Sequence, residues 1–396
     1  MASTHEDIVI AGAGPVGAVC ALALKQGGLD PLVLEARPEN APVNDRRTLA
    51  LSYGSRLLLE RLGIWAGIHD ATPISQIHIS HRGGLGRAFL SAQEEKLPAL
   101  GYVISYGELA QALMNALSQA GVRMRFGVQV KKVEAQNDAA ALALEGEASE
   151  RLHARLAVIA DGGRGQDMPA AKWSRDYAQA AVVAEVKSEL PHRNLAYERF
   201  TPNGPIALLP RGDGYALVWV NAPDEAARVA QLGDAEFLAE LHRQFGNRQG
   251  RFLAVHSRGQ FPLKLDYRGT ESGPHVVRIG NASQTLHPVA GQGFNLGLRD
   301  AWELAESCLN AAPESLGSAM GNHGAHLGSA AQLARYAAGR RRDALPGIGF
   351  TDFLVRSFSN THPVAHHLRG LGLMALQALP PARHFVARRM LFGKNG

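Results

Sequence analysis

The sequence predicts an α/β fold in which an inserted antiparallel sheet interrupts a mainly parallel one and a helical extension follows. Three observations support this prediction. A continuous β-branched strand at 7–10 precedes a Gly-rich turn and a helix, the order typical of a parallel sheet covered on both faces. From about residue 172 to 270, short strands are punctuated by Pro and Gly, as in antiparallel sheets. After residue 276 the parallel-sheet pattern returns, so the first domain is discontinuous.

The order of elements follows from the hydrophobic pattern. The first part is predicted to hold helices at 18–26, 56–62 and 106–120 and strands at 31–35, 122–126, 128–133 and 156–160. The inserted sheet is predicted from strands at 181–186, 195–200, 206–209 and 215–220. The extension is expected to be helical, with interruptions at Pro346-Gly347 and Pro380-Pro381. The predicted domains are 1–171 with 275–330, then 172–274, then 331–396.

Composition indicates an ordinary globular protein of 396 residues, with 46% hydrophobic and 19% charged residues. Cys20 and Cys308 are the only cysteines, so neither a disulfide framework nor a metal-ligand spacing is expected. Residues 1–7 lead straight into a strand without a cleavable signal pattern, and no apolar run reaches the ~18–20 residues of a membrane span. We therefore expect a cytoplasmic protein, soluble or peripheral to the inner membrane.

Charge is unevenly distributed along the chain. The net charge is +5, yet residues 331–396 hold nine Arg and one Lys against two Asp. Apolar residues accompany these cations at 353–358, 368–376 and 385–392, a pattern that indicates an amphipathic surface for a membrane or partner protein. A helical lid packed on the body with a solvated basic face explains the pattern equally well. No nucleic-acid fold signature is visible, so no nucleic-acid partner is expected.

A dinucleotide-binding turn is predicted near the N-terminus. Gly12-x-Gly14-x-x-Gly17 lies between a strand and a helix, where the three glycines permit a tight turn, approach of backbone to a pyrophosphate, and helix packing. Glu35 ends the following strand, where a carboxylate accepts hydrogen bonds from a ribose diol. The context predicts a Rossmann-like site for a ribose without a 2′-phosphate.

Two further segments fit the same cofactor. Asp161-Gly162 follows a buried strand and faces the ligand crevice, unless it is only a solvated turn. The stretch 280–300 follows another strand with a Gly-rich loop that opens a helix, and such an end, with its unpaired N–H groups, suits anionic oxygen or nitrogen. Sites of this kind at both ends of a domain imply one large cofactor held from both sides.

These motifs resemble the flavin-dependent aromatic hydroxylases, the group A FAD monooxygenases, over residues 5–310. Gly12, Gly14, Gly17, Glu35 and Asp161-Gly162 match two of the family's fingerprints in order, and Arg47 matches an arginine near the flavin. The ribityl- and flavin-contacting segment is matched by Gly280-Asn281, Pro288, Gly291-Gln292-Gly293 and Asn295. The resemblance therefore implies that these residues bind FAD tightly and non-covalently.

Within the family, the ubiquinone-biosynthesis hydroxylases, in particular those of 2-polyprenyl-6-methoxyphenol, are most similar. The segments that carry this likeness are 197–201, 204–210, 218–219 and 284–288. Two features depart from the family: the Asp161-Gly162 motif continues as Gly163-Arg164 rather than through a Ser to an Arg, and Tyr106 stands where many relatives have Arg. Asn281 stands where most relatives have Asp, and the 2-polyprenyl-6-methoxyphenol hydroxylases share this Asn.

The implied reaction is hydroxylation of a polyprenyl phenol. In the family, NAD(P)H transiently binds and reduces FAD, O₂ adds at flavin C4a, and the electron-rich ring takes the distal oxygen of the hydroperoxide. His287 is a hypothetical aid to substrate deprotonation, and a role in packing or capping its loop is the alternative. Ile206–Leu209 and Leu217–Trp219 are expected to form an apolar substrate wall or, alternatively, the core face of the sheet.

Other functions stay open at this point. A flavoprotein reductase would share the same motifs and would differ in not incorporating oxygen. A non-catalytic FAD-binding scaffold of a biosynthetic complex would bind flavin without substrate-stimulated NAD(P)H oxidation. A halogenase is not expected, because the Trp-x-Trp-x-Ile-Pro segment of that class is absent.

Overall fold

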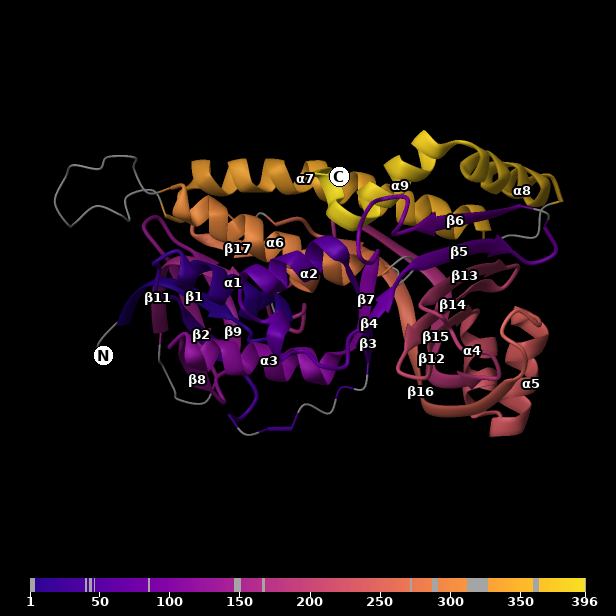
Figure 1. Ribbon diagram of the computed structural model, residues 1–396. Helices are drawn as coiled ribbons and strands as arrows, with labels where there is room; N and C mark the ends of the chain where they lie inside the picture. Colours follow the sequence, from indigo (N-terminus) through magenta and orange to yellow (C-terminus); the bar gives the residue numbers. More distant parts are fainter. Residues whose placement is uncertain are drawn as a thin grey trace.

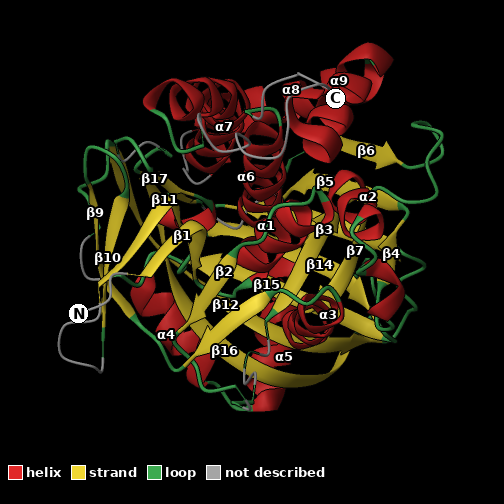
Figure 2. Ribbon diagram, turned by 90° about the vertical axis from the view of Figure 1, so that its left-hand side faces the viewer, coloured by secondary structure: helices red, strands yellow, loops and turns green. Residues whose placement is uncertain are grey.

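The computed structural model describes residues 4–39, 41–42, 45, 47–84, 86–145, 151–165, 168–270, 273–286, 291–311, 327–358 and 363–395. A mainly parallel sheet and a large antiparallel sheet lie side by side, and the C-terminal helices run along one side of both (Figures 1 and 2). The predicted fold class is thereby confirmed.

The first sheet is built in the order β8-β2-β1-β11-β10-β9, with β17 beside β11. Its parallel strands are β1 (Thr4–Ala11), β2 (Leu32–Glu35), β8 (Arg123–Phe126), β11 (Arg151–Ile159) and β17 (Val276–Arg278), and its antiparallel arm is β9 (Val130–Ala135) with β10 (Ala140–Leu144). Because β17 pairs with β11 across a long insertion, this sheet is discontinuous in sequence, as predicted. Helices α1 (Pro15–Gln26), α3 (Tyr106–Gln119) and α6 (Gln292–Leu309) pack on it through a common apolar core.

The second sheet follows the order β18-β16-β12-β15-β14-β13-β5-β6. Its strands are β12 (Trp173–Ser188), β13 (Leu195–Thr201), β14 (Gly204–Arg211), β15 (Gly214–Asn221), β16 (Phe252–Tyr267), β18 (Gln284–Thr285), β5 (Gln76–His81) and β6 (Arg87–Ser91). Strands β5 and β6 come from the first part of the chain, and β5 pairs with β13 in parallel. Two helices that the sequence did not predict, α4 (Pro223–Gln231) and α5 (Asp234–Phe245), cover one face of this sheet (Figure 1).

A small three-stranded sheet lies between the two large ones. It consists of β3 (Thr48–Ser52), β7 (Gly101–Ser105) and β4 (Thr72–Ile74). In the chain, α2 (Tyr53–Arg61) follows β3 directly, and the short η1 (Trp65–Gly67) lies between α2 and β4. Its strands stand between the α/β part and the large sheet in Figure 1. This sheet therefore places Arg47, which directly precedes β3, beside Tyr106 at the start of α3.

The C-terminal extension is helical, in α7 (Ala330–Phe358), α8 (Pro363–Ala378), α9 (Pro380–Phe392) and η4 (Gly393–Asn395). A helix boundary at Pro380 agrees with the prediction, but the interruption predicted at Pro346-Gly347 is wrong, since α7 continues through Pro346. Ala344 and Ile348, on either side, are buried against Leu265 of β16, and this packing offsets the hydrogen bond that proline cannot make. None of the described helices is long and apolar enough to span a bilayer.

Candidate functional site

The predicted dinucleotide turn lies between β1 and α1. Gly12 has φ +107°, and Gly14 is the N-cap of α1 with no side-chain cap. A Cβ on Gly14 would meet nothing within 4 Å, because this residue borders open space, whereas a Cβ on Gly17 would lie 2.0 Å from the carbonyl oxygen of Gly12. The free N–H groups of the first turn thus face a cavity, and Gly17 keeps α1 close to the strand.

Glu35 lies at the end of β2, beside that turn. Its carboxylate accepts hydrogen bonds from the backbone N–H of Ala13 at 2.8 Å and of Arg37 at 3.0 Å, and from Arg37 Nε at 2.9 Å. Burial favours the neutral form, but the bonds from Arg37 and Ala13 outweigh it and hold the pKa of Glu35 below its ordinary value. The side chain is therefore an anion with further lone pairs to offer a ribose diol.

The loop before β3 brings Arg47 to the same cavity. Its guanidinium donates to Asp45 from Nε at 2.9 Å and from a terminal nitrogen at 2.6 Å, and it lies 5.1 Å from the ring centre of Tyr106. Arg47, Asp45 and Tyr106 all line the cavity. The arginine is thus oriented by a carboxylate and an aromatic ring.

Asp161 and Gly162 follow β11 at the carboxyl edge of the parallel sheet. The Asp161 side chain accepts a hydrogen bond from the N–H of Gly163 at 2.9 Å, and Gly162 adopts φ +74°. Both residues line the cavity, so this aspartate closes a turn and also faces the ligand crevice.

The described residues of the predicted flavin loop also line this cavity. Asn281 lies in η2 (Gly280–Ala282), and Gly291, at φ +59°, is the N-cap of α6, again without a side-chain cap. Asn281, Gly291, Gly293 and Asn295 line the cavity. His287 and Pro288 lie outside the described residues.

Asn295 has a bracing role that its sequence position did not reveal. Its side chain accepts from the N–H of Ser52 at 2.8 Å and donates to the carbonyls of Ala50 at 2.9 Å and Gly291 at 2.7 Å. All three bonds go to backbone, so this amide fastens β3 to the first turn of α6. Its contribution to the cavity is to hold that wall in place.

One cavity of about 1940 Å³ joins these loops to the large sheet. Typical small-ligand pockets hold about 300–1,000 Å³, so this volume accommodates a dinucleotide and a second molecule. The sheet wall alternates as strands must: Ala207, Leu209 and Val218 line the cavity, while Ile206, Leu208 and Trp219 pack beneath α4 and α5. In these apolar segments, alternate residues thus face the cavity or the core of the sheet, and Leu217 borders both.

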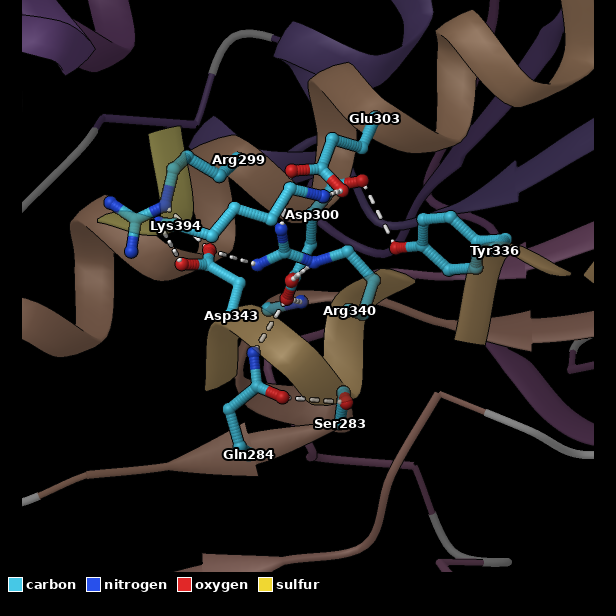
Figure 3. Close-up of polar contacts among 10 residues, drawn as sticks. Ser283, Gln284, Arg299, Asp300, Glu303, Tyr336, Arg340, Asp343 and Lys394 are labelled. Carbon is cyan, nitrogen blue, oxygen red and sulfur yellow. Dashed lines mark hydrogen bonds and ion pairs between the residues drawn. The ribbon is translucent and has the colours of Figure 1, made fainter. Parts of the chain in front are cut away.

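The start of the predicted flavin loop, at 280–284, is anchored by a buried ionic cluster (Figure 3). Asp300 on α6 accepts hydrogen bonds from the N–H of Gly280 at 3.1 Å, from Gln284 Nε2 at 2.6 Å and from Arg340 Nε at 2.7 Å. Asp300 and Arg340 are 0% and 2% exposed. Because Gly280 and Gln284 flank Asn281, this aspartate fixes one end of the loop.

Arg340 connects that anchor to the C-terminal extension. Besides Asp300, its guanidinium pairs with Glu303 at 2.8 Å and Asp343 at 3.1 Å, and Lys394 joins both of these carboxylates (Figure 3). Although burial disfavours the charge, the three carboxylates raise the pKa of Arg340 above its ordinary value. An acid within the buried stripe of α6 was the signal in the sequence that could have revealed this cluster.

Another residue that sequence reasoning missed is Glu198, in the cavity wall. The alternation of β13 places it on the cavity face, and nothing in the local sequence distinguishes that face from the packed one.

Among the described residues, no group of three or more His, Cys, Asp or Glu side chains is placed to hold a metal ion.

The residues around this cavity fit FAD. Two uncapped helix N-termini, at Gly14 and Gly291, border it, and an ionised Glu35 ends the strand after α1. The first end suits a pyrophosphate and the second the electron-rich edge of an isoalloxazine ring, because both present unpaired N–H groups. The open space beside Gly14 leaves room for that close approach.

Comparisons with known proteins agree with this geometry. The sequence model of the family described as FAD binding domain matches residues 5–317. The chain is 32% identical to ubiquinone hydroxylase UbiL of Rhodospirillum rubrum, over 97% of this chain and 89% of that protein. It is also 32% identical to 3-demethoxyubiquinol 3-hydroxylase of Escherichia coli, over 95% and 96% of the two chains.

Solved structures give the same fold. The structure of p-nitrophenol 4-monooxygenase from Pseudomonas putida superimposes with a TM-score of 0.76 at 17% identity, over 99% of this chain and 100% of that one. At that identity the likeness concerns the fold alone. Taken with the family match and the full-length relatives, it shows that the chain belongs to the FAD-binding domain family and is an FAD-dependent monooxygenase.

Proposed function

We propose that this enzyme hydroxylates the ring of a polyprenyl phenol in ubiquinone biosynthesis, with NAD(P)H and O₂ as co-substrates. Relatives named as ubiquinone hydroxylases support the substrate class. The observation that carries the proposal is the single cavity that joins the dinucleotide-binding loops to an apolar sheet wall. Such a cavity suits a reaction between a bound flavin and an apolar ring.

In this proposal residues 1–171 with 275–330 bind FAD, residues 172–274 together with β5 and β6 bind substrate, and 331–396 cover the cavity. Bound FAD would supply the redox chemistry by accepting a hydride from NAD(P)H and activating O₂. Gly12 and Gly14 would hold the pyrophosphate at α1, and Glu35 would accept hydrogen bonds from the ribose. Asn281 and Asp161-Gly162 would face the ribityl chain, with Arg47 near the flavin.

The first turn of α6 would serve the flavin ring electrostatically. Backbone N–H groups at Gly291 and Gly293, with the helix dipole behind them, favour negative charge at the ring edge that they face. The apolar wall of Ala207, Leu209 and Val218 would hold the substrate ring and exclude water from it. Each of these roles follows from groups that already face the same cavity.

The test is an isotope experiment with the flavin-loaded protein. A short-chain prenylated methoxyphenol, NADPH or NADH, and heavy-isotope O₂ are expected to give a product with one labelled oxygen atom. Unlabelled O₂ in labelled water is the control and should give no label. A reductase would consume NAD(P)H without labelled product, and a scaffold would show no substrate-stimulated oxidation, so either result would contradict hydroxylation.

We further propose that the C-terminal helices rest on an anionic membrane surface. Leu371, Leu379 and Phe385 are 56%, 55% and 70% exposed on or between α8 and α9. Leu373 and Val386, on the same two helices, line the cavity, so the apolar wall continues toward this surface. Exposed Arg341, Arg342 and Arg388 supply positive charge for phospholipid head groups.

This contact predicts a specific loss of vesicle binding. The double substitution Leu371→Asp with Phe385→Asp is expected to reduce flotation with phosphatidylglycerol vesicles by about tenfold or more. Both exposed apolar side chains would insert into the membrane in the wild type, and burial of each contributes about 1.5–3 kcal/mol to binding. Leu190→Asp, at a site 49% exposed far along the chain, is the matched control and should float like the wild type. Equal flotation of the double variant and the control would contradict the membrane contact. It would also be contradicted if the double variant kept its vesicle binding and lost binding to a partner protein.

A further inference from the structure

An isolated carboxylate stands in the apolar wall of the cavity. Glu198 lies on β13, and the residues beside it in one row across the sheet are Ile79, Ala207, Val218 and Val183. Each of these neighbours is apolar, and each lines the same cavity. Glu198 is thus the ionisable member of an otherwise hydrocarbon row.

Nothing in the described part of the chain bonds to this carboxylate. The side chain accepts no hydrogen bond and forms no ion pair there, whereas Glu185, on the same face, contacts Arg211 at 3.4 Å. Arg199 and His78 belong to the opposite face of the sheet, where the His78 ring packs edge to face with the Tyr197 ring. The charged groups that share the cavity with Glu198 are Glu35, Arg37, Asp45, Arg47, Asp161, Arg164, Glu185, Asp352 and Arg369.

A carboxylate in this position can gain a hydrogen bond only from a ligand in the cavity. Leaving an anion without hydrogen bonds in an apolar wall is costly, and a ligand that donates a hydrogen bond removes that cost. Burial alone raises the pKa of Glu198 to about 7, and no neighbouring charge contributes to this shift. A side chain with this pKa exchanges protons readily at neutral pH.

We propose that Glu198 is the catalytic base that accepts the proton of the substrate's ring hydroxyl. This inference rests on the proposed phenol hydroxylation. The O–H bond of the phenol breaks, the proton passes to a Glu198 oxygen, and the electron pair stays on the ring oxygen. That pair raises the electron density of the ring carbon that bonds to the incoming oxygen atom, which flavin and O₂ chemistry supplies. The hydroxylated ring carbon then loses its own hydrogen as a proton to water, which restores aromaticity and returns the electron pair to the ring oxygen, and Glu198 gives its proton back to that oxygen.

The decisive variant is Glu198→Gln in the flavin-loaded enzyme. Its amide oxygen still accepts the hydroxyl hydrogen bond, so KM for a short-chain prenylated methoxyphenol should change little, while kcat falls by about 10²-fold or more. The wild-type rate should decline below about pH 7, where Glu198 is protonated, and this acid limb should vanish in the variant. Glu185→Gln is the matched control and should retain the acid limb.

Two readouts separate this role from the proposed function. A bound prenylated 4-nitrophenol should show its phenolate difference spectrum at pH 7.5 with the wild type and its phenol spectrum with Glu198→Gln. Thermal unfolding should show the variant more stable than the wild type at pH 8 but not at pH 5, because a raised acid pKa removes native stability as pH rises through 7. Wild-type hydroxylation with an unaltered pH profile, probe spectrum and melting difference in Glu198→Gln would overturn the assignment of the base and leave the proposed function standing.

Discussion

The substitution Asp300→Ala is expected to lower the free energy of unfolding by about 3–5 kcal/mol and to deplete bound FAD. Removing one member of a buried ion pair leaves the other charge without compensation, and costs of this size are typical. Here the substitution removes the bond from Arg340 at 2.7 Å together with those from Gly280 and Gln284. The free energy of unfolding and the amount of bound FAD should therefore fall together.

The measurement combines denaturant unfolding with the ratio of flavin to protein after purification. Glu306→Ala is the matched control, because Glu306 is an exposed acid on the same helix. Asp300→Asn should fall between the control and Asp300→Ala, since the amide oxygen can still accept a bond. If Asp300→Ala unfolded at the same denaturant concentration as Glu306→Ala and kept its flavin, the anchoring role would be wrong.

The substitution Gly17→Ala is expected to cost about 3 kcal/mol, the upper part of the range for overpacked sites. Its Cβ would lie 2.0 Å from the Gly12 carbonyl oxygen and 3.2 Å from the Ala160 side chain, so α1 would have to move off the sheet. Because α1 carries the first helix N-terminus of the cavity, flavin affinity should fall as well. Thermal unfolding of the flavin-free protein and fluorescence titration with FAD measure the two effects.

Gly14→Ala provides the comparison that separates folding from binding. Its Cβ meets nothing within 4 Å, so stability of the flavin-free protein should change by less than about 0.5 kcal/mol. The added methyl group borders the cavity where backbone must approach the pyrophosphate, so FAD affinity should drop by about tenfold or more. An unchanged FAD affinity in Gly14→Ala would contradict the proposal that the pyrophosphate binds at this turn.

Local patterns allowed much of the α/β part to be predicted. The Gly12–Gly17 turn, the strand that ends at Glu35 and the return of the sheet at β17 each depend on residues close together in sequence or on a repeated pattern. The inclusion of β5 and β6 in the large sheet could not be predicted, because β6 joins it through β5, and the pairing of β5 with β13 spans more than a hundred residues. Pairings of that range leave no mark in a short window of sequence.

The other differences between the predictions and the structure depend on which side chains are buried in the folded protein. Pro346 normally ends a helix, yet its neighbours pack against β16 and α7 continues. Tyr197 and Glu198 are adjacent, but one packs under α5 and the other faces the cavity, and only the register of β13 decides which. Asn295 matched a cofactor motif, although its side chain bonds to backbone on both sides of the loop.

The ionic cluster around Arg340 also bears on the order in which the protein matures. Ribosomes add Asp300 well before Arg340, and Lys394 comes later still, so an acid that is buried in the folded protein is synthesised before its counter-charges. The contacts of Asp300 with Arg340 can form only after the α7 segment has been synthesised. The anchor of the predicted flavin loop thus depends on residues that the ribosome adds after the loop itself.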